Sequence, residues 1–201
     1  PINNNYWLVN LIKMKINIEH NIKTYQIDSD DGVSISIPVQ FNQNLNPKFY
    51  DESNPSKEYY KSNGIEYNLD QLSGCNVPLI TMNIHCSGTH TETAAHVIKD
   101  SYFISDLTNM NFIPATLISI TSESNINENY HIPINNDDEM ITKETLEKYF
   151  DSDNKFSDCI IIRTLPNDDK KKVKNYNKHA YPFLSNNAVF FLKEMGIKHI
   201  V

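Results

Sequence analysis

Cysteine is scarce in this sequence. Cys75, Cys86 and Cys159 are the only three among 201 residues, an odd number at unrelated spacings. They suggest neither a disulfide framework nor a zinc site of the CxxC type, because both need cysteines paired at defined spacings. We therefore expect the protein in a reducing compartment, the cytoplasm.

Clustered basic residues and long apolar runs are also lacking. The formal net charge is −7, and Lys and Arg are scattered except at residues 170–172. A nucleic-acid-binding face needs clustered Lys and Arg. No run of 18 apolar residues exists. The apolar stretch at residues 6–12 is too short to span a membrane and is interrupted by a polar residue. We expect a small-molecule partner and neither nucleic acid nor membrane.

The length and composition predict one folded domain. Apolar residues make up 39% of the chain and charged residues 21%, which is typical of a globular protein. Met14 opens an alternating pattern, so we expect the domain at residues 14–201 and an upstream extension, not native, at residues 1–13. The apolar residues 196–201 look like a strand entering a core, so we expect the native domain to continue beyond Val201.

The first half of the chain reads as strands and loops. Alternation at residues 15–19 and 23–27 predicts a hairpin. Residues 33–39 place their apolar side chains on one face, which predicts a half-buried strand. The polar and aromatic stretch 40–74 is expected to be a long loop that could cover a site. Residues 79–84 predict a strand that leads directly into a histidine cluster.

The second half alternates strands and helices. Strands are expected at residues 112–121, 159–162 and 197–201, and helices at residues 142–150 and 186–195. Thr142 and Ser185 are expected to cap the two helices, and Gly196 to end the second. The strand at 159–162 is apolar throughout, as a strand buried on both faces would be. This order predicts an α/β domain whose sheet is at least partly parallel.

Three of the seven histidines lie with one glutamate within twelve residues: His85, His90, Glu92 and His96. Imidazole and carboxylate are ligands of borderline divalent metals such as zinc, and catalytic sites use about three of them. A polar loop whose side chains only cap a helix or bond to backbone would be the alternative. The density of ligand types favours a metal site.

The spacing limits how these side chains could meet one ion. His90 and His96 are separated by roughly 240° on a single helix, which excludes the HExxH arrangement. If His85 ends a strand and residues 87–88 turn the chain, His90 and Glu92 share one face of an extended segment. His96 follows Glu92 by four residues on an expected helix and can lie on the same side. We expect His85, His90 and Glu92 as ligands and His96 as an acid/base.

Other residues could also have a role in such a site. Cys86 could be a soft ligand or a nucleophile, but nothing in the spacing supplies the base and orienting group that a nucleophile needs. Phe41, Phe49 and the tyrosines of the expected loop could line the pocket of an aromatic substrate, and core packing would explain them equally well.

The histidine cluster resembles the motif H-x-G-T-H-x-D-x-x-x-H of the cyclase family, which includes bacterial kynurenine formamidases and isatin hydrolases. Residues 88–92 and His96 follow the motif, with His85 upstream. Here one extra residue separates the first two histidines, Glu92 replaces the usual Asp, and Thr93 stands where the family has Pro. Further similarities follow in family order: residues 35–39, 162–164, 181–184 and 196–198.

This resemblance implies a swivelling β/β/α domain with a mixed sheet, assembled as a dimer or tetramer. It implies zinc or manganese held by His85, His90 and Glu92, with His96 as the catalytic acid/base. Two further metal ligands of the family, a His and a Glu, would lie beyond Val201. The implied reaction is hydrolysis of an amide, formamide or lactam bond in a small molecule, as an arylformamidase of tryptophan catabolism performs. The alternative is a non-catalytic relative that binds a small molecule or a partner.

Overall fold

The computed structural model describes residues 14–71, 73–99, 103–107, 112–124, 128, 130–153, 155–178 and 181–201. The extension expected at residues 1–13, including the apolar stretch 6–12, lies outside these residues. The chain divides into two compact units, Pro1–Ile35 and Ser36–Val201. In the described part of the chain, no helix has both the length and the apolar character needed to cross a membrane.

The first unit contains an antiparallel hairpin. Strand β1 (Lys15–His20) pairs with β2 (Lys23–Asp28). The two residues between them, Asn21 and Ile22, both have positive φ (48° and 58°), which is the backbone of the tight turn whose twist suits a hairpin. The hairpin predicted from the alternating pattern is confirmed. A 3-10 turn, η1 (Ser29–Asp31), follows it.

The strand expected at residues 33–39 is wrong. These residues have no regular secondary structure, and Val33 and Ile35 are 85% and 64% exposed. An apolar face makes a strand only where a neighbouring strand accepts its hydrogen bonds and a core covers that face. Here no strand of the described residues pairs with this stretch, Ile37 and Val39 are only half-buried, and the amide of Ile37 donates to the Thr89 hydroxyl at 3.0 Å.

The long loop expected at residues 40–74 is also wrong in part, because this stretch contains short strands. β3 (Ser56–Tyr59) pairs antiparallel with β6 (Pro78–Thr81), and β4 (Lys61–Ser62) with β5 (Ile65–Glu66). The short turn η2 (Leu69–Gln71) follows β5 and precedes β6 in the chain. A strand of two residues, such as β4 or β5, is too short to show an alternating pattern in the sequence, and the turn residues beside it suggest a loop.

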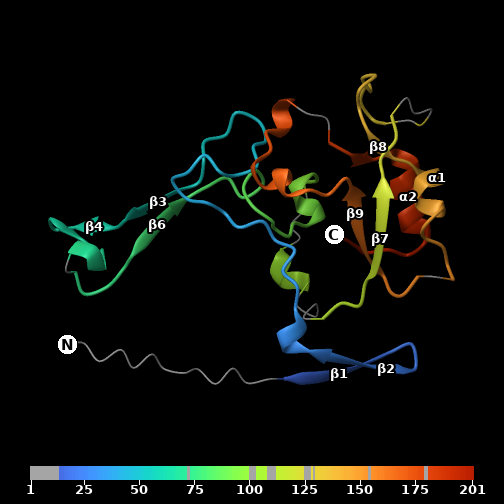
Figure 1. Cartoon of the computed structure of the whole chain (residues 1–201), viewed down its shortest axis with the longest axis horizontal. Helices are drawn as coiled ribbons and strands as arrows, with labels where there is room; N and C mark the ends of the chain where they lie inside the picture. The colour runs from blue at the N-terminus through green and yellow to red at the C-terminus, as the bar shows by residue number, and fades with distance from the viewer. Residues whose placement is uncertain are drawn as a thin grey trace. The chain divides into compact units, whose positions relative to one another are not determined.

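The centre of the second unit is a parallel sheet in the order β11-β9-β7 (Figure 1). The strands are β7 (Thr116–Thr121), β9 (Cys159–Leu165) and β11 (His199–Ile200). Cys159 and Ile160 are buried, whereas Ile161 and Ile162 are only half-buried. The strand β9, which was expected to be buried on both faces, is therefore buried only at its start. The predicted parallel α/β arrangement is confirmed.

Two helices and a small parallel pair of strands pack with this sheet. α1 (Lys143–Glu147) and α2 (Asn186–Glu194) carry the predicted caps: Thr142 Oγ1 accepts from the Thr145 amide and Ser185 Oγ from the Ala188 amide, each at 3.0 Å. β8 (Met140–Ile141) pairs with β10 (Phe183–Leu184). The core contains apolar side chains of these strands and helices: Ile118, Ile120, Ile141, Leu146, Phe150, Ile160, Ala188, Phe191 and Leu192.

The remaining elements are single 3-10 turns. They are η3 (Ala94–His96), η4 (Ile104–Leu107), η5 (Asp169–Val173) and η6 (Tyr176–Lys178). The turns η3 and η6 matter most for the site, because each contributes a side chain to the cavity described below.

Candidate metal centre

His85 lies in a turn that Asn83 organises. β6 ends at Thr81, so the expected strand does not run into His85. Instead the Asn83 side-chain oxygen accepts a hydrogen bond from the His85 amide at 3.0 Å, and the Asn83 carbonyl accepts from the Cys86 amide at 3.2 Å. An Asn side chain that bonds to the backbone two residues later is a common turn device. It fixes the backbone that carries His85.

Gly88 turns the chain toward His90 in a conformation that suits only glycine. Its φ is +75°, and an added Cβ would lie 2.6 Å from Val39 Cγ2. The Gly88 carbonyl lies 3.1 Å from His90 Nδ1. Because a carbonyl can only accept, Nδ1 carries a proton, and in the neutral ring this leaves the lone pair on Nε2. The turn therefore sets both the direction and the tautomer of His90.

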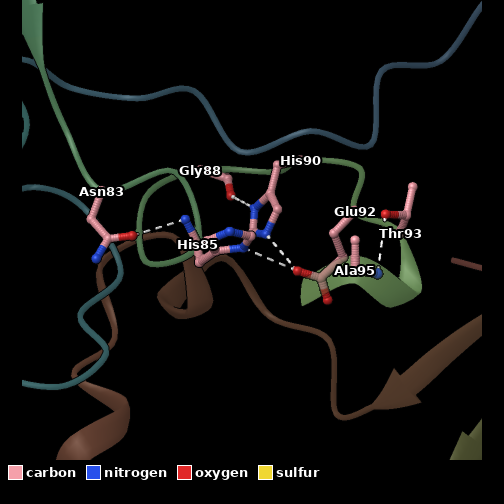
Figure 2. A network of polar contacts seen from close by, with 7 residues as sticks. All are labelled: Asn83, His85, Gly88, His90, Glu92, Thr93 and Ala95. Carbon is pink, nitrogen blue, oxygen red and sulfur yellow. Dashed lines mark hydrogen bonds and ion pairs between the residues drawn. The ribbon is translucent and has the colours of Figure 1, made fainter. Parts of the chain in front are cut away.

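Two histidines converge on one carboxylate oxygen (Figure 2). Glu92 Oε2 lies 3.1 Å from His85 Nδ1 and 3.6 Å from His90 Nε2. The two imidazole rings are nearly perpendicular, with 5.5 Å between centroids and an interplanar angle of 82°. The side chains are 38% (His85), 32% (His90) and 48% (Glu92) exposed. Ion pairs this exposed add little stability, so they are a poor explanation for the convergence.

His96 joins this group from the turn η3, which forms in place of the longer helix expected there. Thr93 Oγ1 accepts from the Ala95 amide at 3.3 Å and caps the turn (Figure 2). The His96 ring stacks on His85, with 4.0 Å between centroids. Ligand atoms of His85, Glu92 and His96 all lie within 4.8 Å of one another. His90 approaches Glu92 but is not part of this group, and which of His90 and His96 is a ligand stays a prediction.

The donor set fits a divalent metal ion. With metal–ligand bonds of about 2.0–2.1 Å, ligand atoms around a tetrahedral zinc lie roughly 3.4 Å apart. The separations of Glu92 Oε2 from His85 Nδ1 and His90 Nε2, 3.1 and 3.6 Å, bracket this value. Among the described residues, the group of three whose ligand atoms all lie close enough for one ion is His85, Glu92 and His96. Nitrogen and carboxylate donors suit zinc, and carboxylate donors also suit manganese.

The histidines open onto a cavity of about 830 Å³. Besides His85, His90 and His96, its walls are formed by residues that come from three stretches of the chain: Ile37, Pro47, Phe49, Tyr50, Glu52, Asn83, Cys86, Gly88, Thr89 and Tyr176. Of the aromatic residues considered as pocket-lining, Phe49 and Tyr50 line it, whereas Phe41 does not. A cavity of this size is typical for a small-molecule ligand.

One wall of the cavity is aromatic. Phe49 stacks on Tyr176 with 4.7 Å between centroids and an interplanar angle of 4°, and Tyr181 meets both rings edge-on. Burial raises the pKa of the Tyr176 hydroxyl, and the negative charge of Asp168 raises it further. Tyr176 is therefore an un-ionised hydrogen-bonding group at neutral pH. No motif or spacing in the sequence indicates that Tyr176 belongs to the site.

Backbone hydrogen bonds join this wall to a distant part of the chain. The Lys48 amide donates to the Lys174 carbonyl, and the Tyr176 amide donates to the Lys48 carbonyl, each at 2.9 Å. The Asn177 side chain bonds to both the amide and the carbonyl of Tyr50, whose φ is +56°. No local pattern predicts such pairs, because the partners are 127 residues apart.

Cys86 is half-buried on the cavity wall next to His85. The structure thus places a thiol in the site without giving it a role.

The comparison with known families decides what the chain is related to. The model of the family described as "Putative cyclase" matches residues 14–201. The chain belongs to the cyclase family. The resemblance inferred from the histidine motif is thereby confirmed, and the mixed α/β structure of this cyclase chain is consistent with it. Neither the curated proteins nor the solved structures contain a match to it.

Proposed function

We propose that the protein is a metal-dependent hydrolase of a small molecule and cleaves an amide, formamide or lactam C–N bond, as an arylformamidase does. The observation that carries this proposal is the meeting of His85 and His90 at Glu92 Oε2 on the wall of the cavity. Membership in the cyclase family supports it. The proposal includes the swivelling β/β/α fold, assembly as a dimer or tetramer and a cytoplasmic location.

His85, His90 and Glu92 would hold the ion, zinc or manganese. When bound, such an ion activates water at neutral pH and polarises a carbonyl group. The bond between His90 Nδ1 and the Gly88 carbonyl supports a ligand role for His90. Metal-binding histidines usually donate their second ring N–H to such an acceptor, which fixes the ring and makes it a better ligand.

His96 would transfer the proton between the attacking water and the leaving amine. A proton carrier must be free to bind and release a proton near the reacting atoms. In the described part of the chain the His96 ring stacks on His85 but takes part in no hydrogen bond, unlike the ring of His90. His96 also lines the cavity, so its nitrogens can reach a bound substrate.

A non-catalytic binding protein is the second candidate. It is favoured by the two departures from the family motif, the extra residue between His85 and His90 and the longer arm of Glu92. In a protein of this kind the cavity would bind a small molecule while the histidine cluster would have lost its chemistry.

Metal content and turnover together test the proposal. The full-length protein should contain about one or two zinc or manganese ions per chain, melt at a lower temperature after chelation, and hydrolyse an aryl formamide. A His20→Ala variant in the hairpin is the control and should match the wild type. A folded, metal-free protein whose melting chelators do not change would overturn the proposal. Metal binding without any turnover of formamides, amides or lactams would favour the non-catalytic candidate.

A further inference from the structure

Glu52 places a fixed negative charge in the cavity. It lies on the same wall as Phe49 and Tyr50. The Asn83 amide nitrogen donates to Glu52 Oε1 at 3.1 Å. The other oxygen, Oε2, accepts no hydrogen bond and pairs with no cation among the described residues. One oxygen is therefore held in place while the other is available to a ligand.

The same Asn83 couples this carboxylate to the metal centre. Its side-chain oxygen accepts from the His85 amide at 3.0 Å, while its nitrogen donates to Glu52. Two hydrogen bonds from one planar amide thus fix Glu52 relative to the backbone of His85. A ligand group bound at Glu52 would be held at a set distance from the histidines.

No basic side chain neutralises Glu52 in the cavity. None of the described residues that line the cavity is Lys or Arg. Lys174 lies with its Nζ 5.2 Å from the centroid of the Tyr176 ring and does not line the cavity. Among the described lining residues the negative charge of Glu52 therefore meets no permanently charged cation, and it attracts a positive ligand group. Phe49 lines the same cavity and offers an apolar surface.

We propose that Glu52 is the residue that selects the substrate by charge, and that the cavity takes small amides carrying a protonated amine next to an aromatic or apolar part. The ammonium group donates to Glu52 Oε2, the apolar part lies against Phe49, and the scissile carbonyl reaches the histidines. This inference rests on the proposed function only for the statement that the bound molecule is a substrate.

Binding of two simple probes tests the charge selection without any turnover. Phenethylamine, which is protonated at neutral pH, and 2-phenylethanol, which is neutral, have the same ring and similar length, and neither carries a carboxylate that would bind a metal ion at the histidines. Their affinities for the full-length protein can be measured by ligand-observed NMR. We expect phenethylamine to bind more tightly to the wild type, and Glu52→Gln to weaken it about threefold to tenfold, the range for a charge-assisted contact that is partly open to solvent.

Two further variants make the result specific. Glu58→Gln removes the same charge from the exposed strand β3, outside the cavity, and should leave both affinities unchanged. Glu52→Asp keeps the charge and should retain the preference for phenethylamine. Equal binding of the two probes by the wild type, or an equal loss in Glu58→Gln and Glu52→Gln, would overturn the inference.

Turnover separates this inference from the proposed function. If the protein hydrolyses amides, Glu52→Gln should raise KM for a cationic amide, leave kcat nearly unchanged, and have no effect on a neutral amide. Hydrolysis with no preference for cationic amides would overturn the inference and leave the hydrolase proposal intact. Charge-selective binding of the probes without hydrolysis would overturn the hydrolase proposal and leave this inference intact.

Discussion

The imidazole rings of His85 and His96 are stacked, with 4.0 Å between their centroids and 28° between their planes. The two side chains therefore share one side of the site, and His90 approaches Glu92 from another. Because His85 and Glu92 belong to both possible ligand sets, the roles of His90 and His96 distinguish the two sets.

Replacing each of these two histidines in turn identifies the ligand. We expect His90→Ala to lower the affinity for zinc at least about tenfold, because even loss of a supporting group costs that much. His96→Ala should keep the zinc affinity and lower kcat about 10²- to 10⁴-fold. A competition titration with a chelator and steady-state kinetics measure the two effects. The opposite pattern would assign the ligand role to His96.

Glu92 should be needed for its charge and not only for its shape. Glu92→Gln keeps the length of the side chain but removes the negative charge that pairs with both histidines. We expect zinc affinity, measured by calorimetry, to fall at least about tenfold, since the amide is a much weaker ligand than the carboxylate. The exposed Glu144→Gln on α1 is the control. Equal affinities of the two variants would remove Glu92 from the site.

Gly88→Ala should destabilise the fold and displace His90. A side chain at φ +75° costs about 1–2 kcal/mol, and the contact with Val39 adds to this cost. Gly74→Ala is a matched control, because its added Cβ would meet nothing within 4 Å, and it should change stability by less than about 0.5 kcal/mol. Urea denaturation measures both. Similar urea midpoints for Gly88→Ala and Gly74→Ala would show that the turn accepts a side chain at position 88.

The three cysteines should differ in reactivity. Burial raises the pKa of the Cys159 thiol, and the neighbouring Asp158 charge acts in the same direction, whereas Cys75 is exposed. At pH 8 we expect iodoacetamide to modify Cys75 quickly and Cys159 only after unfolding, as peptide mass spectrometry would show. Rapid labelling of Cys159 in the native state would contradict this.

The raised pKa of Cys159 also means that folding favours the neutral thiol, so the contribution of this thiol to stability is lost above pH ~8.5.

Local signals in the sequence predicted the elements that local interactions determine. The hairpin follows from alternation, and the two helix starts follow from Thr142 and Ser185, whose hydroxyls accept from amides three residues later. The expected strand at residues 33–39 failed because a strand needs a partner, and partners are set by the tertiary fold. The same limit hid the short strands within residues 40–74.

The candidate site shows the same division. Four ligand-type side chains within twelve residues are evident from the sequence, and a turn residue such as Asn83 two positions before His85 could have been recognised from its type. Tyr176 could not, because it reaches the site only through hydrogen bonds between distant segments. Phe49 was identified as a candidate by residue type alone.

The distance along the chain between contacting residues sets the entropic cost of forming each wall of the cavity. The histidine cluster closes a loop of about twelve residues, whereas the contact of Tyr50 with Asn177 closes one of 127. The longer closure costs roughly 2 kcal/mol more in chain entropy. The histidines can therefore meet at a small cost in chain entropy, whereas the aromatic wall forms only when the long loop is closed. Loosening Asn177 would widen the entrance for bulky molecules and leave the histidine cluster assembled.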